Sequence, residues 1–275
     1  MLNNGNNFEL YCFQQLNNLY PNNQQAKLRL QQELDAIKRH NKIEDYNHAK
    51  NIAQISLSNG YPVFFRGSVT SSLVAFLTGI SSVDPIKYNI PIEVFLGNNE
   101  SKVSWKFEVE VFKDIFPKIL EYIEKFYDCD KNIGDNYHPV SAFNSSGDKV
   151  FTIFWMLTKN SLSQMALRTN TNLTKIPFDD EKTYAMLRTG DVEDLPFAEF
   201  YQGNPVYMFR KSYPHDLESL AWILTSLNEP IYPFYKSHTL EVARIFYMYA
   251  YFKANFPNIY FDEIKEDENK ICKNV

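Results

Sequence analysis

The chain has 275 residues, of which 44% are hydrophobic and 16% are aromatic. This is enough apolar surface for a sizeable core, so the composition excludes a disordered chain. Lys and Arg total 28 against 33 Asp and Glu, which gives a net charge of −5. That balance excludes a generally basic nucleic-acid coat but not a local basic groove, because net charge averages over surfaces that act separately.

The cysteines and the opening segment bear on the compartment. Cys12, Cys129 and Cys272 are far apart and odd in number, with no CxxC pair, so we expect free thiols in a reducing compartment instead of disulfides or structural zinc. Residues 1–20 lack the basic and apolar regions of a signal peptide. No apolar run approaches the ~20 residues that a membrane-spanning helix needs. We therefore expect a soluble, cytoplasmic protein with no membrane partner.

The first sixty residues predict helices after a polar lead. Residues 1–25 are rich in Asn and Gln, and such a lead usually frays. Between residues 27 and 57, Leu and Ile recur at helical spacing among charges. This pattern predicts helices with a break near Asn41.

A strand, a tight turn and a helix follow. Residues 61–65 form a short apolar run that leads directly into Arg66-Gly67-Ser68. Residues 73–77 continue as an apolar helix, and Gly79 supplies its stop.

A second strand is predicted at 107–112, where apolar and acidic residues alternate. Because a strand has period two, Glu108 and Glu110 face the same side. A one-sided apolar pattern predicts a helix over 115–127, and residues 128–149 have the composition of a loop.

The second half of the chain is predicted to be mostly helical. Ahead of the helices, residues 150–157 form an apolar run, which predicts a strand. The predicted helices are 162–167, 181–188, 216–226 and a long aromatic helix at 239–255. The charged tail from Glu263 is expected to fray.

The turn at 66–72 is the most informative local feature. A strand that delivers a glycine and several hydroxyls to a helix start places free N–H groups where phosphate binds well, and Arg66 adds a bidentate donor. Ordinary capping by Ser or Thr explains the same residues without a ligand.

Two further features have a functional and a structural interpretation. Glu108 and Glu110 suit a two-metal site, whose ions need bridging carboxylates, but also suit an edge strand with acidic solvent-facing positions. Lys236 and His238 suit a phosphate or base contact, but also a polar helix cap. The aromatic stripe of the helix that follows them is typical of a core.

Together these segments resemble one family, the bacterial DNA polymerase III alpha subunit, which is the C-family replicative polymerase and includes the PolC branch. Residues 59–97 resemble its palm signature, in which a Gly-Arg-Gly-Ser turn opens a helix, and residues 102–111 fall where the family has a Pro-Asp-x-Asp strand. Residues 176–191 are similar to the family's Ile-Pro-Leu-Asp-Asp segment, and 197–229 follow the next helical stretch loosely. Residues 236–257 resemble the fingers segment that begins Lys-Ser-His.

The resemblance implies an α+β fold, with a polymerase-beta-like nucleotidyltransferase palm and a helical fingers-like portion. The implied parts are a polar N-terminal lead at 1–26, a palm-like domain at 27–160, a helical fingers-like portion at 161–260 and a charged tail at 261–275.

The resemblance also implies a phosphate-binding set and partners. In the family the Arg-Gly-Ser turn and the fingers Lys and His approach the incoming triphosphate. The corresponding positions here are Arg66, Gly67, Ser68, Ser71, Ser72, Lys236 and His238. Nucleoside triphosphate, DNA and replication proteins are the implied partners.

The departures concern the catalytic carboxylates. One register puts Lys106 and Glu108 at the two aspartate positions of the family strand, and a slip of the alignment puts Glu108 and Glu110 there. The counterpart of the strand with the third aspartate, 150–157, has no acidic residue.

Three hypotheses follow, and the sequence leaves open whether the chain is an enzyme. The first, which the missing acid favours, is a palm and fingers protein that binds nucleotide or primer–template with polymerase catalysis weakened or lost. The second is a minimal nucleotidyltransferase in which Glu108 and Glu110 hold two Mg²⁺ ions; without activity no cofactor is expected. The third is a non-enzymatic interaction protein.

Overall fold

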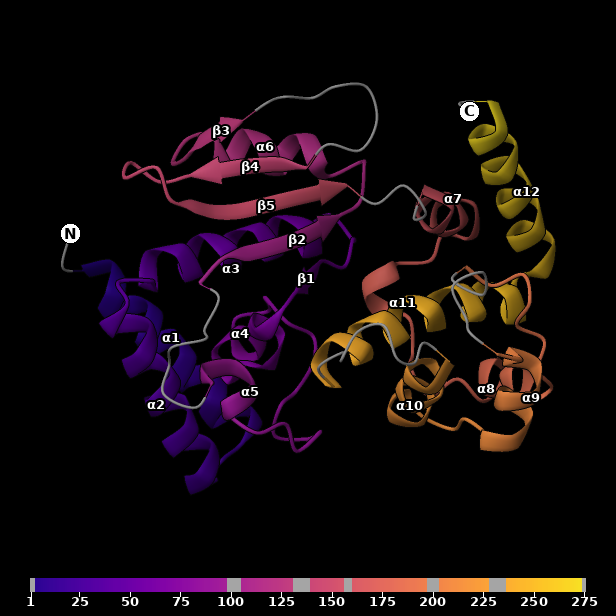
Figure 1. Ribbon diagram of the computed structural model, residues 1–275, viewed down its shortest axis with the longest axis horizontal. Coiled ribbons are helices and arrows are strands. Elements are labelled where there is room, and N and C mark those ends of the chain that lie inside the picture. The colour runs from indigo at the N-terminus through magenta and orange to yellow at the C-terminus, as the bar shows by residue number, and fades with distance from the viewer. Residues whose placement is uncertain are drawn as a thin grey trace. The chain divides into compact units, whose positions relative to one another are not determined.

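The computed structural model describes residues 3–97, 105–130, 139–155, 160–196, 203–227 and 236–273. The chain divides into two compact units, Met1–Trp155 and Met156–Val275 (Figure 1). The first contains a small mixed sheet with helices, and the described part of the second is helical. This confirms the α+β class. None of the helices in the described ranges is long and apolar enough to cross a bilayer.

The sheet of the first unit has five strands in the order β1-β2-β5-β4-β3. β2 and β5 run parallel, and the other neighbouring pairs are antiparallel. The strands are β1 (Phe64–Arg66), β2 (Phe107–Val111), β3 (Asp128–Asp130), β4 (Val140–Phe143) and β5 (Lys149–Trp155).

The described part of the first unit also contains helices. They are α1 (Asn3–Leu19), α2 (Gln24–Arg39), α3 (Ile43–Ser58), the 3₁₀ helix η1 (Ser68–Ser71), α4 (Leu73–Leu77), α5 (Glu93–Leu96) and α6 (Phe116–Ile123). Tyr46 of α3 meets Phe107 of β2 edge-on at a centroid distance of 5.0 Å, and Phe107 stacks on Phe151 of β5 at 5.2 Å. The alternation in β2 therefore places Phe107 in the core beneath α3, and Glu108 and Glu110 on the other face of the sheet.

From Asn3 onward the polar lead is helical, contrary to the expectation that it frays. Phe8, Cys12 and Leu16 of α1 lie four residues apart and are all buried. The average composition hides this apolar stripe, because most of the Asn and Gln residues lie outside residues 8–16. The predicted helix break near Asn41 is confirmed, since Asn41 has a positive φ of 55° between α2 and α3.

The region 128–149 was expected to be a loop but contains β3 and β4. Both strands are short, at three and four residues, so their sequence carries little periodic pattern. β4 is held by its pairing with β5, where Val140 lies opposite Ile153.

The described part of the second unit consists of helices around α11. The elements are α7 (Asn160–Thr169), η2 (Leu173–Lys175), α8 (Glu181–Arg188), α9 (Pro205–Ser212), α10 (Leu217–Leu227), α11 (Lys236–Asn255) and α12 (Pro257–Lys273). Phe246 stacks on Phe209 of α9, and Tyr247 contacts Tyr184 of α8. These buried rings confirm that the aromatic stripe forms a core.

Two helices of this unit were not expected. The tail forms α12, which is anchored because Tyr260 is buried and Glu263 accepts a hydrogen bond from Arg168. α9 is short. Asn204 precedes it as the N-cap residue, and the Asn204 side chain accepts a hydrogen bond from the Tyr207 amide.

Candidate functional site

Strand pairing gathers three of the predicted site residues on one face of the sheet. Arg66 of β1 lies opposite Glu108 of β2, and Phe64 lies opposite Glu110. Paired residues point to the same side, so Arg66, Glu108 and Glu110 share a face. Arg66 forms an ion pair with Glu110, and the two side chains are 46% and 13% exposed. Lys106 lies just before β2 and is exposed.

The neighbouring strand β5 completes this surface, which we call the Arg66 face. Thr152 lies opposite Glu108, and Phe154 lies opposite Glu110. The Arg66 guanidinium carbon lies 5.2 Å from the centre of the Phe154 ring. Partial burial lowers the pKa of Arg66, and the Glu108 carboxylate raises it. Because an arginine guanidinium ionises far above neutral pH, a lowered pKa still leaves Arg66 charged.

These residues do not fit a site for two magnesium ions. Such a site holds ions about 3.5–4 Å apart with several carboxylates. Glu110 is already paired with a guanidinium, and β5 contributes a hydroxyl and a ring beside the glutamates. Within the described ranges, no group of three or more His, Cys, Asp or Glu side chains is placed to hold a metal ion.

The turn between β1 and η1 depends on Gly67. Its φ of 80° and ψ of −166° belong to a region that residues with a side chain rarely adopt. The turn is closed by Thr70, whose hydroxyl donates to the Gly67 carbonyl at 2.8 Å. The Ser68 hydroxyl is buried, and it has no hydrogen-bond partner in the part of the chain that the structure describes.

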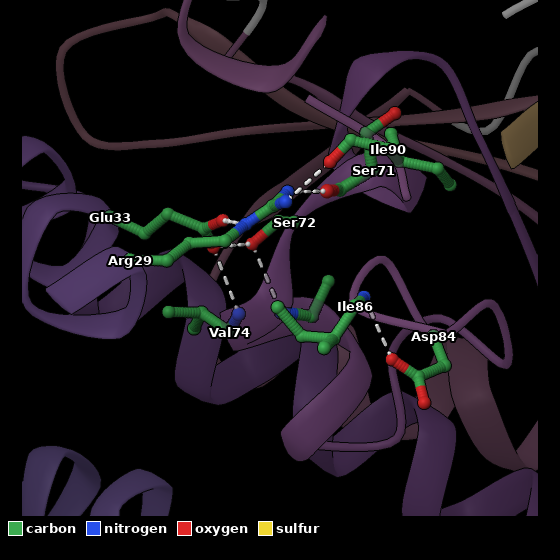
Figure 2. A network of polar contacts seen from close by, with 9 residues as sticks. Arg29, Glu33, Ser71, Ser72, Val74, Asp84, Ile86 and Ile90 are labelled. Atoms are coloured by element: carbon green, nitrogen blue, oxygen red, sulfur yellow. Dashed lines mark hydrogen bonds and ion pairs between the residues drawn. The ribbon is translucent and has the colours of Figure 1, made fainter. Parts of the chain in front are cut away.

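Ser71 and Ser72 are fully buried, and Ser72 makes internal contacts. Ser72 accepts a hydrogen bond from the Ala75 amide at 3.1 Å and so caps α4. Its hydroxyl donates to Glu33 at 2.7 Å, and the Val74 amide donates to the same carboxylate oxygen at 3.0 Å (Figure 2). A carboxylate of the protein itself therefore accepts the hydrogen bond of an amide at the start of α4.

Arg29 ties this carboxylate to the turn. Its Nε donates to Glu33 at 2.9 Å, and one terminal nitrogen donates to the Ser71 carbonyl at 2.8 Å. The other terminal nitrogen donates to the Ile90 carbonyl (Figure 2). The sequence analysis did not single out Arg29 or Glu33. The available signal was the position of Glu33 on the buried face of α2, between Leu30 and Leu34.

The remaining predicted residues, Lys236 and His238, lie in the second unit in the first turn of α11. Lys236 forms an ion pair with Glu218 of α10, and both side chains are about half exposed. His238 is half-buried.

Comparison with known proteins places the first unit in a family. A family model described as the bacterial DNA polymerase III alpha NTPase domain matches residues 6–150. PolC-type DNA polymerases III of Thermotoga petrophila and Thermotoga maritima are each 48% identical over 58 residues, which is 21% of this chain and 4% of theirs. The DNA polymerase III subunit alpha of Thermotoga maritima is 39% identical over 84 residues, which is 30% of this chain and 10% of that protein.

The chain thus spans a tenth or less of the length of these curated relatives. The family model, in contrast, covers more than half of the chain and includes the Arg66 turn and β2. The chain belongs to the family of the bacterial DNA polymerase III alpha NTPase domain.

Proposed function

We propose that this protein binds nucleoside triphosphate or primer–template DNA in a replication setting, with polymerase catalysis weakened or lost. In this proposal, residues 27–160 act as a polymerase-beta-like palm and 161–260 as a fingers-like portion. Family membership supports a role in DNA replication, with replication proteins as partners. The observation that carries the proposal is the Arg66 face, which offers a guanidinium beside two glutamates and the neutral residues Thr152 and Phe154.

The phosphate contact is proposed at Arg66, Gly67 and Ser68. The Arg66 side chain is about half exposed, and a guanidinium has five donors, so its pairing with Glu110 leaves others for a ligand. The buried Ser68 hydroxyl has no partner in the described ranges, and such a group costs about 1–3 kcal/mol. A phosphate oxygen at the turn would satisfy it. In the second unit, Lys236 and His238 are proposed as phosphate contacts of the fingers-like portion by their match to the family's Lys-Ser-His segment.

Weak catalysis follows from the same face. Phosphoryl transfer relies on metal charge at both the attacking and the leaving oxygen. The Arg66 face places Thr152 and Phe154 beside the two glutamates, and neither can replace a bridging carboxylate. We therefore expect the protein to bind nucleotide or DNA while its phosphoryl-transfer activity is weak or absent.

Calorimetry with dATP tests the proposed binding. Arg66→Ala removes charge-assisted hydrogen bonds worth about 1.5–3 kcal/mol, so the affinity should fall by about ten-fold or more. The matched control is Lys125→Ala, which removes an exposed cation just after α6 and should leave the affinity unchanged. Equal affinities for the wild type and Arg66→Ala, or no binding by the wild type, would refute the phosphate site.

The second candidate is a minimal nucleotidyltransferase that uses Glu108 and Glu110 with Mg²⁺. It is favoured by the position of both glutamates on one face of β2. Primer extension with magnesium or manganese and all four triphosphates tests it. Robust extension that disappears in Glu108→Gln and Glu110→Gln would establish this activity. If the protein neither binds nor extends, the non-enzymatic interaction protein becomes the better interpretation.

A further inference from the structure

We infer that the guanidinium of Arg66 takes the place of a divalent cation on the Arg66 face, so that this face does not bind free metal ions. The inference stands on the geometry of the face and is independent of the proposed phosphate contact.

Arg66 lies beside both of the carboxylates that a metal ion on this face would need. It is the direct cross-strand partner of Glu108 and forms an ion pair with Glu110. Glu108 and Glu110 are two residues apart on the same strand face, so their charges repel unless a cation lies beside them. Arg66 supplies that cation from within the chain.

The third strand of the face suits a guanidinium better than a metal ion. The ring of Phe154 lies under the Arg66 guanidinium at 5.2 Å, a contact that favours a flat, weakly hydrated cation. Thr152 is neutral and lies beside Glu108. Mg²⁺ instead requires oxygen ligands in near-octahedral geometry and gains nothing from an aromatic ring.

One consequence follows for metal ions. A divalent cation that approaches Glu110 must displace the guanidinium, and one that binds Glu108 lies close to the positive charge of Arg66. The wild-type face should therefore reject free metal ions.

Metal titration tests this consequence. Calorimetry with MnCl₂ alone should show no binding by the wild type and millimolar binding by Arg66→Ala and by Arg66→Met, which keeps part of the aliphatic stem. Adding Glu108→Gln to either variant should abolish that binding. The control Lys125→Ala removes the cation from an exposed ion pair with the single carboxylate Glu121, and it should gain no binding. Melting curves confirm that each variant is folded.

Two results would overturn the inference. One is Mn²⁺ binding by the wild type that Glu110→Gln abolishes. The other is failure of both folded Arg66 variants to gain Mn²⁺ binding, because the two carboxylates would then not form a cation site at all.

Discussion

The Oε2 atom of Glu33 lies 2.7 Å from the hydroxyl oxygen of Ser72. The two residues are 39 positions apart in the chain, and both are fully buried. Glu33 thereby anchors the start of α4 to α2, next to the turn that carries Arg66. Its negative charge is compensated by the Arg29 guanidinium and by the Val74 amide.

Removing one partner of this buried pair should strongly destabilise the protein. Arg29→Met leaves the Glu33 carboxylate buried without its cation, and breaking a buried pair typically costs about 3–5 kcal/mol. Urea denaturation followed by circular dichroism measures the change. Gln31→Ala on the exposed side of α2 is the control and should change the free energy of unfolding by less than about 0.5 kcal/mol. An equally small effect of Arg29→Met would contradict the proposed anchoring.

A buried lysine should also contribute to stability in the second unit. The Lys253 side chain is 4% exposed, and its ammonium group donates to the Asp191 side chain at 2.7 Å and to its carbonyl at 3.0 Å, and pairs with Asp194. Lys253→Met should lower the free energy of unfolding by about 1.5–3 kcal/mol, because it removes charge-assisted hydrogen bonds, while the two carboxylates are exposed enough to be hydrated. Lys211→Met, an exposed position in the same unit, should have little effect in the same denaturation experiment.

The buried His48 should make stability depend on pH. Burial lowers its pKa, and Glu44 and Asp45 only partly oppose that shift. Its Nδ1 lies 2.8 Å from the Tyr122 hydroxyl, and the rings of Phe126 and Tyr127 pack against it.

The sign of this dependence follows from the lowered pKa. Above the ordinary value of about 6.5, His48 is neutral in both states and contributes no slope. As the pH falls from there toward the folded pKa, the unfolded state takes up the proton first, so the free energy of unfolding falls. Each unit of difference between the two pKa values is worth about 1.4 kcal/mol. His48→Gln should flatten this part of the profile, and the exposed control His215→Gln should not.

The two described thiols should react at different rates. Burial raises the pKa of Cys12 to about 12, whereas Cys129 is only half-buried. At pH 8 only about one Cys12 thiol in ten thousand is ionised, and the thiolate is the reactive form. Mass spectrometry after iodoacetamide treatment of the folded protein should find Cys129 alkylated well before Cys12. Faster labelling of Cys12 would mean that α1 opens readily.

The sequence predicted those features of the Arg66 face that depend only on neighbouring residues in the chain. Strand alternation placed Glu108 and Glu110 on one side of β2, and the turn after β1 drew attention to Arg66. The pairing of β1 with β2 joins segments about forty residues apart, and no local pattern encodes such a partner. The ion pair between Arg66 and Glu110 was therefore not predictable from either segment alone.

The same limit applies to the start of α4. Ser72 was correctly read as a residue that can cap a helix, but the carboxylate beside it comes from α2. Similarly, β4 is too short to show a period and forms because β5 provides a partner. In each case local propensity predicted the element or the residue type, and tertiary contact decided its role.

The turn at Gly67 has a consequence for handedness. An added Cβ would meet nothing within 4 Å, so the space beside this residue is open and size does not dictate glycine here. Glycine is instead required by the backbone φ of 80°, because this conformation suits the mirror image of an ordinary L-amino acid. A D-alanine introduced at position 67 by chemical ligation should therefore preserve the turn, whereas its L-enantiomer should distort it. Chirality, and not volume, restricts the residue that joins β1 to η1.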